Sequence, residues 1–164
     1  MMRVFISHSS KDEKLVESLK KHLEKTFKDV CYFYTAADDP QPGQNLAVKI
    51  QKEIEQADVF LVLLTPNSKK SSYVNQEIGY AKKCGKRIIA LVMKGTPQEA
   101  LGMLAGDEYI IHIKDEIPES LINVLIKEAI KKVEENQPKQ ALDPVILAII
   151  VVIILFLLAF VSEK

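Results

Sequence analysis

The sequence predicts an α/β domain built on a five-stranded parallel sheet with helices on both faces, followed by one C-terminal transmembrane helix. Five short runs of branched and aromatic residues alternate with longer segments in which apolar residues recur every three or four positions. The runs are nearly continuously apolar, as in VFLVLL at 59–64, which is typical of strands covered on both faces. This strict alternation favours a parallel sheet between two layers of helices.

The strands and the first helix follow from local patterns. The strands are expected at residues 3–7, 30–34, 58–64, 87–92 and 109–112. In the first helix, apolar residues recur every four positions from Leu15 to Phe27. Ser10 and Glu13 have the spacing of a capping box, so the helix is expected to begin there.

The remaining helices are predicted in the same way. Apolar spacing marks a second helix over 46–54 and a third over 74–84, which Gly85 should end at a C-cap position. A short helix is expected around 98–104. A long one is expected over 118–135, with a proline in its first turn.

Charge and cysteine content exclude several classes of protein. The chain carries 22 basic and 22 acidic side chains, and the basic ones are dispersed, so we expect no nucleic-acid partner. Cys31 and Cys84 cannot form a disulfide framework, which indicates a reducing compartment. No Cys/His cluster has metal-ligand spacing, and neither GxGxxG nor GxxxxGK[ST] occurs, so neither a metal nor a permanently bound cofactor is expected.

The C-terminal segment is predicted to be a membrane anchor. Residues 145–161 contain no polar side chain and would extend roughly 25 Å as a helix, close to the ~30 Å of a bilayer core. Four lysines precede this run and one follows it, which predicts that the preceding domain lies in the cytoplasm. The expected organisation is a folded domain over 1–135, a linker over 136–144, a single membrane span over 145–161 and a tail over 162–164.

Glu77 breaks the pattern of the third helix. At about 100° per residue, it falls inside the apolar arc that contains Val74, Ile78 and Ala81, on a face roughly 160° wide. A carboxylate on a face that packs against the sheet must be paired, neutralised or used in chemistry. The alternative from geometry alone is a glutamate at the edge of this face that reaches solvent or caps its own helix.

Three segments resemble the TIR domain, the Toll/interleukin-1 receptor type of flavodoxin-like domain. VFISHSSKDEKLVESLKKHLEK at 4–25 is similar to the family's first strand, serine-rich loop and first helix. DDPQPGQNLAVKIQKEIEQADVFLVLLT at 38–65 resembles the family's BB loop, second helix and third strand. SKKSSYVNQEIGYA at 68–81 is similar to the serine, aromatic and glutamate motif, with tyrosine where many members have tryptophan. The resemblance covers residues 3–135, and it implies a flavodoxin-like fold of the prokaryotic TIR type.

In the branch of the family that cleaves NAD, the glutamate matching Glu77 is catalytic. Carried over, Glu77 would stabilise the oxocarbenium-like centre that forms as nicotinamide leaves, or would take the ribosyl group covalently. The resemblance adds a substrate-binding set around it, composed of Ser7, His8, Ser9, Asp12, Phe33 and Tyr73. It also implies an interaction loop that joins neighbouring TIR domains, with Asp38, Asp39, Pro42 and Gly43. On the residues alone, His8 could be an ordinary loop histidine, Phe33 a core residue, and the two aspartates a solvated turn.

Three functions remain open from the sequence. The first is cleavage of NAD, as substrate, by hydrolysis or by cyclisation to an ADP-ribose signal, in signalling or antiviral defence of the Thoeris type. TIR domains would then self-associate and a separate protein would act as the effector. The second is a non-catalytic TIR module that recruits partners through its interaction loop. The third follows from EIGYAKKCGKRIIAL at 77–91, which resembles nucleoside 2-deoxyribosyltransferases.

Overall fold

The computed structural model describes residues 1–36, 38, 46–102, 104, 109–113 and 143–162. The chain divides into two compact units, Met1–His112 and Ile113–Lys164. The strands are β1 (Met2–Ser7), β2 (Cys31–Thr35), β3 (Val59–Leu64), β4 (Arg87–Met93) and β5 (Tyr109–Ile113). The α-helices are α1 (Glu13–Thr26), α2 (Leu46–Gln56), α3 (Ser72–Lys83) and α5 (Pro144–Ser162). Three 3-10 helices connect them: η1 (Ser10–Asp12), η2 (Pro66–Lys70) and η3 (Gln98–Leu101).

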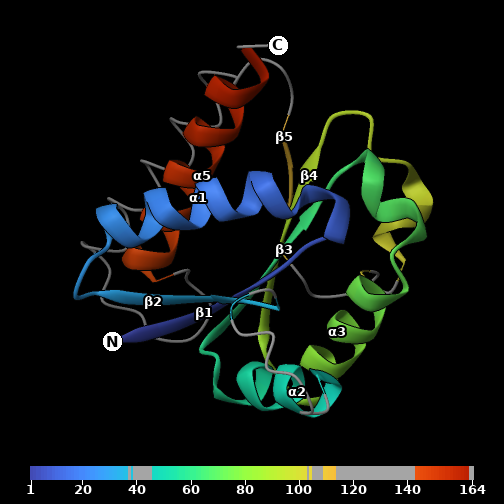
Figure 1. The fold of residues 1–164 in the computed structure, drawn as a ribbon, viewed down its shortest axis with the longest axis horizontal. Helices are drawn as coiled ribbons and strands as arrows, with labels where there is room; N and C mark the ends of the chain where they lie inside the picture. Colours follow the sequence, from blue (N-terminus) through green and yellow to red (C-terminus); the bar gives the residue numbers. More distant parts are fainter. Residues whose placement is uncertain (37, 39–45, 103, 105–108, 114–142, 163–164) are drawn as a thin grey trace. The chain divides into compact units, whose positions relative to one another are not determined.

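The five strands form one sheet in the order β2-β1-β3-β4-β5, and Figure 1 shows them at the centre of the fold. β1 pairs in parallel with β2 on one side and with β3 on the other, and β3 pairs in parallel with β4. This order is that of flavodoxin-like folds, in which ligands bind beyond the carboxyl ends of the strands. The predicted five-stranded parallel sheet is confirmed.

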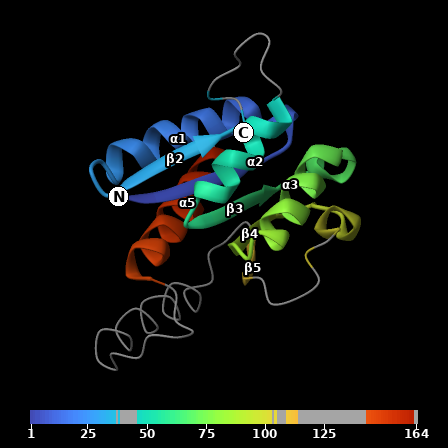
Figure 2. The ribbon, with the colours of Figure 1, turned by 90° about the horizontal axis from the view of Figure 1, so that it is seen from below.

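Helices cover both faces of the sheet, as the sequence predicts. Figures 1 and 2 show α1 on one side of β1 and β2, and α2 with α3 on the other side. On the side of α2 and α3, the rings of Phe5 and Phe60 stack 5.5 Å apart and pack with Ile54 and Ile78 in one buried core. Because side chains alternate along a strand, β1 directs Phe5 and Ser7 to this side of the sheet.

Helix ends differ from the prediction at one place and confirm it at another. η1 precedes α1, and Ser9 rather than Ser10 caps this first turn, its hydroxyl accepting a bond from the amide of Lys11. The predicted capping box of Ser10 and Glu13 is therefore wrong, because the chain makes a 3-10 turn before the α-helix begins. Gly85, with a φ of 63°, follows the end of α3 as predicted. Its positive φ suits glycine, which carries no Cβ.

The C-terminal apolar segment forms α5, which has 19 residues. Within the ranges that the structure describes, no helix is long and apolar enough to cross a membrane. The predicted transmembrane span over 145–161 is therefore not supported. The expected helix over 118–135 and the domain boundary at 135 lie outside the described residues.

Candidate active site

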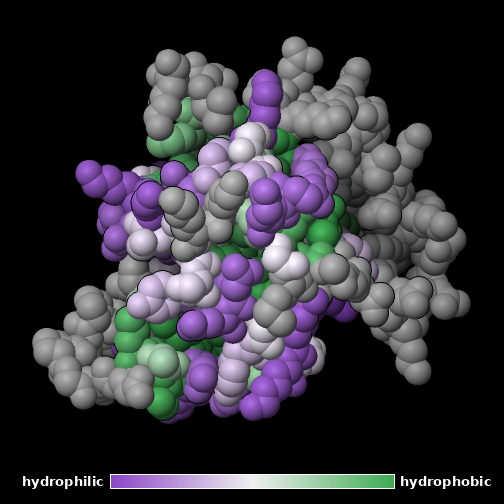
Figure 3. All heavy atoms as spheres, turned by 90° about the vertical axis from the view of Figure 1, so that its right-hand side faces the viewer, coloured by the Kyte–Doolittle hydropathy of each residue, from purple (hydrophilic) through white to green (hydrophobic). Residues whose placement is uncertain are grey.

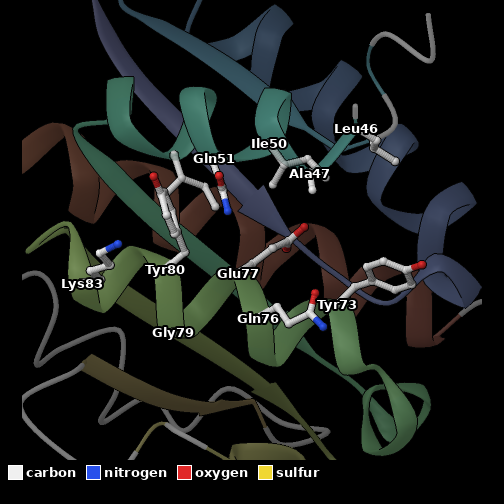
Figure 4. A pocket seen from close by; sticks show the side chains of 11 residues that line it. Leu46, Ala47, Ile50, Gln51, Tyr73, Gln76, Glu77, Gly79, Tyr80 and Lys83 are labelled. Atoms are coloured by element: carbon white, nitrogen blue, oxygen red, sulfur yellow. The ribbon is translucent and has the colours of Figure 1, made fainter. Parts of the chain in front are cut away.

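A cavity of about 520 Å³ lies between α2 and α3. Figure 4 shows the side chains that line it. Figure 3 shows the right-hand side of the molecule in Figure 1, and hydrophobic residues gather at its lower left, where α2 lies. α2 contributes Leu46, Ala47, Ile50, Gln51 and Ile54, and α3 contributes Tyr73, Gln76, Glu77, Gly79, Tyr80 and Lys83. The size falls within the usual range for small-molecule sites, so the cavity is large enough for part of a dinucleotide.

Glu77 lies on the wall of this cavity and is only 8% exposed. It shares the buried face of α3 with Val74, Ile78 and Ala81, as the helical spacing predicts. Its Oε2 accepts a hydrogen bond from the hydroxyl of Ser7, the last residue of β1. The carboxyl group therefore neither reaches out to solvent nor caps its own helix, which decides between the two interpretations that the sequence left open.

The environment of Glu77 changes its ionisation. Burial raises the pKa of the Glu77 carboxyl from 4.5 to about 7, and the hydrogen bond from Ser7 lowers the pKa in part. Removing a carboxylate from water disfavours its charged form, whereas a donor that faces it favours that form. A carboxyl group with a pKa near 7 can exist in both forms at neutral pH, which is the usual condition of an acid or base in an active site.

Ser7 is almost completely buried, with 1% of its surface exposed. The sequence placed it among the residues that hold ribose or phosphate. In the structure its hydroxyl is directed to Glu77 rather than outward. The two residues are 70 positions apart and meet because β1 ends, and α3 begins, at the same edge of the sheet.

Asp12, Ser9 and His8 lie on the loop that follows β1. The Asp12 carboxylate is 7% exposed, and its two oxygens accept bonds from the Thr65 hydroxyl at 2.7 Å and the Asn67 side-chain amide at 2.6 Å. Ser9 is 3% exposed, and the Nδ1 of His8 lies 2.9 Å from its backbone oxygen. These contacts tie the loop after β1 to the loop after β3. Substrate binding by Ser9, His8 and Asp12 stays a prediction.

Phe33 does not line the cavity. Its Cα pairs with that of Val4, so its side chain lies on the face of the sheet opposite to Phe5. There it is fully buried, with its ring centroid 6.3 Å from that of Phe27 at the end of α1. The suggestion that Phe33 touches the ligand is corrected to a core position beneath α1, because one residue along a strand changes the face.

The structure describes two further residues of the predicted sets, Tyr73 and Asp38. Tyr73 lines the cavity one turn before Glu77 and is 69% exposed, so it stands at the rim. Asp38 accepts a hydrogen bond from the amide of Thr35 and pairs with the Nζ of Lys20 on α1. The other residues of the predicted interaction loop, Asp39, Pro42 and Gly43, lie outside the described residues.

Sequence reasoning misses the α2 wall of the cavity and the bonds that connect the end of α2 to neighbouring elements. The hydroxyl of Tyr80 bonds to the Glu55 carboxylate near the end of α2. The Nζ of Lys86 donates to the backbone oxygens of Glu55 at 2.6 Å and Ala57 at 2.9 Å. These bonds connect the end of α2 to α3 and to the residue before β4. The sequence carries no direct signal of these contacts, because they depend on how two helices pack against each other.

No three His, Cys, Asp or Glu side chains of the described ranges lie close enough together to hold a metal ion. The polar groups at the cavity are one buried carboxyl, the amides of Gln51 and Gln76, one lysine and two phenols. Such a site can bind an uncharged or cationic group next to an ionisable carboxylate.

Comparison with known proteins identifies the family. The sequence-family model for the TIR domain matches residues 4–126. The chain is similar to TIR2 of Cytobacillus dafuensis, provisionally named a cyclic ADP-D-ribose synthase, with 26% identity over 108 residues. The match covers 63% of this chain and 28% of that protein, so this chain spans little more than a quarter of that relative.

Two solved structures share the fold. The TIR domain of the Toll-related receptor TRR-2 from Hydra magnipapillata has a TM-score of 0.53 and 16% identity, covering 80% of this chain and 98% of that one. The TIR domains of the activated Roq1 resistosome, which recognises the pathogen effector XopQ, have a TM-score of 0.51 and 12% identity, covering 100% and 86%. Since the family model also matches well over half of the residues, the chain belongs to the TIR domain family.

Proposed function

We propose that this TIR domain cleaves the N-glycosidic bond between nicotinamide and ribose in NAD, with Glu77 as the catalytic carboxylate. The observation that carries the proposal is a buried carboxyl group on the wall of a cavity of about 520 Å³, with the Ser7 hydroxyl bonded to one of its oxygens. The relative named for cyclic ADP-D-ribose synthesis supports it by similarity.

The chemistry needs stabilisation of positive charge more than it needs a general acid. Nicotinamide is attached to ribose as a cationic pyridinium, so it departs as a neutral molecule once the bonding electron pair moves to its ring nitrogen. The positive charge then lies on the anomeric carbon and ring oxygen of the ribose. A preorganised carboxylate a few ångströms away, in a site shielded from water, stabilises that charge far better than it would in bulk water.

The raised pKa of Glu77 fits this reaction. In the free protein at pH 7 about half of the Glu77 carboxyl groups are protonated, because the pKa is about 7. A pyridinium cation placed beside the carboxyl group favours the ionised form and lowers its pKa. Binding of NAD therefore releases the proton from the Glu77 carboxyl group and leaves the charged carboxylate that the reaction needs. Tyr73, at the rim of the cavity, would cover the nicotinamide ring.

The role we propose for the product is a signal, either ADP-ribose or a cyclised form, in signalling or defence of the Thoeris type with a separate effector protein. Self-association of TIR domains belongs to the same proposal. The cytoplasmic location of the domain stays a prediction.

The test is a product analysis of the full chain. The protein is incubated at high concentration with NAD, and in a parallel sample with a 2′-deoxynucleoside, and the products are separated by chromatography. Nicotinamide together with ADP-ribose indicates hydrolysis, and nicotinamide with a cyclised product indicates a cyclase. Release of a free base in the deoxynucleoside sample, with no product in the NAD sample, would instead favour a deoxyribosyltransferase. No product in either sample, at any protein concentration, would leave the recruiting module as the function and contradict the proposal.

A further inference from the structure

Ser7 ends β1, an inner strand of the sheet, and its side chain reaches Glu77. β1 lies between β2 and β3 in the sheet, and the Cα of Ser7 pairs with that of Val62 in β3. The side chain is 1% exposed and points to the face covered by α3. The sheet therefore fixes the face to which the Ser7 side chain points, and the bond to Glu77 sets the direction of its hydroxyl.

The two oxygens of the Glu77 carboxyl group are not equivalent. Oε2 accepts the bond from Ser7. Among the residues that the structure describes, Oε1 has no hydrogen-bond partner. Figure 4 shows the Glu77 carboxyl group directed into the space between α2 and α3. One oxygen is thus held by the sheet, and the other is left for a ligand.

We propose that Ser7 is a positioning residue for Glu77: by donating to Oε2 it fixes the carboxyl group so that Oε1 faces the cavity. As a statement about the reaction, this rests on the proposed cleavage of NAD. It assigns to Ser7 a role toward the catalytic group, in place of direct contact with ribose or phosphate.

Other charged groups near Glu77 do not take this role. The titratable side chains that share the cavity with Glu77 are Tyr73, Tyr80 and Lys83, all on α3, whereas α2 contributes apolar side chains and Gln51. The two causes that act on the pKa of Glu77 are burial, which raises it, and the bond from Ser7, which lowers it. Removing the Ser7 hydroxyl therefore leaves burial unopposed, and the titration of Glu77 moves to higher pH.

The test measures the carboxyl group itself and then the reaction. Glutamate labelled with carbon-13 at Cδ reports the titration of Glu77 by NMR, and the Glu77→Gln variant identifies its signal. We expect Ser7→Ala to raise the midpoint by about one pH unit. Ser7→Thr, which keeps the hydroxyl, should restore it. Thr96→Val is the matched control, since the Thr96 hydroxyl bonds to the backbone oxygen of Leu64 at 3.1 Å and not to Glu77.

In the cleavage assay, the acid side of the pH profile should move by the same amount. At pH 6 the Ser7→Ala protein should then cleave NAD roughly tenfold more slowly than Ser7→Thr, with a smaller difference at pH 9. An unchanged Glu77 titration in a folded Ser7→Ala protein would overturn the inference. If the wild-type chain releases no nicotinamide, the proposed function fails, while the NMR titration still decides whether Ser7 holds Glu77.

Discussion

Replacing Glu77 by glutamine should stabilise the protein, and only above a defined pH. The folded-state pKa of Glu77, about 7, lies above its ordinary value of 4.5. Between these values the folded chain binds more protons than the unfolded chain, so the free energy of unfolding falls as the pH rises. Glutamine has the shape of glutamate and can still accept the bond from Ser7, but it carries no charge to be buried.

The size of the effect follows from the shift. The Glu77 pKa rises by about 2.5 units, from 4.5 to about 7, and each unit corresponds to about 1.4 kcal/mol. The Glu77→Gln variant should therefore be more stable by about 3 kcal/mol at pH 7 and above, and nearly equal to the wild type at pH 4. In a chain of this length that difference raises Tm by roughly 6 to 12 °C.

The assay is urea unfolding followed by circular dichroism at pH 4, 5.5, 7 and 8. Glu17→Gln is the matched control: Glu17 is an exposed glutamate of α1 that pairs with Lys21, and the same change there should give no stabilisation at any pH. A stability difference for Glu77→Gln that does not change with pH, or a loss of stability at pH 8, would refute the idea that burial of this carboxyl group destabilises the fold.

Three further substitutions test individual contacts. Asp12→Ala should lower the free energy of unfolding by about 1 to 3 kcal/mol, because the buried Thr65 hydroxyl and the side-chain amide of Asn67 lose their acceptor; an unchanged urea midpoint would contradict this. Gly102→Ala should cost more than about 1 kcal/mol, since Gly102 has a φ of 43° and a Cβ there would lie 2.3 Å from the Oδ1 of Asn75; an unchanged Tm would count against it. Tyr73→Ala should leave stability within about 0.5 kcal/mol, as expected for an exposed side chain, and raise the KM for NAD; an unchanged KM would remove Tyr73 from the site.

The position of Glu77 could be predicted from the sequence because helical periodicity is a local property. Its neighbours on the apolar arc are buried as expected, and so is Glu77. The bond between Ser7 and Glu77 could not be predicted with the same certainty. The period of two along β1 places Ser7 on the same face as Phe5, but only the packing of α3 against the sheet shows which face that is.

Residues whose role depends on packing between elements were assigned less well. Phe33 differs from Tyr34 by one position, and this alone moves it from the face of Glu77 to the face of α1. The wall made by α2 depends on how two helices pack against each other, and Tyr80 and Lys86 bond to the end of α2.

The most direct test of the central claim is the rate of nicotinamide release from NAD at pH 8, compared between the wild-type chain, Glu77→Gln and Glu17→Gln. The account predicts release by the wild type and by Glu17→Gln, and a rate at least about a hundredfold lower for Glu77→Gln, since the positive charge on the ribose then has no carboxylate beside it. Equal release by all three proteins would contradict the assignment of Glu77 as the catalytic group.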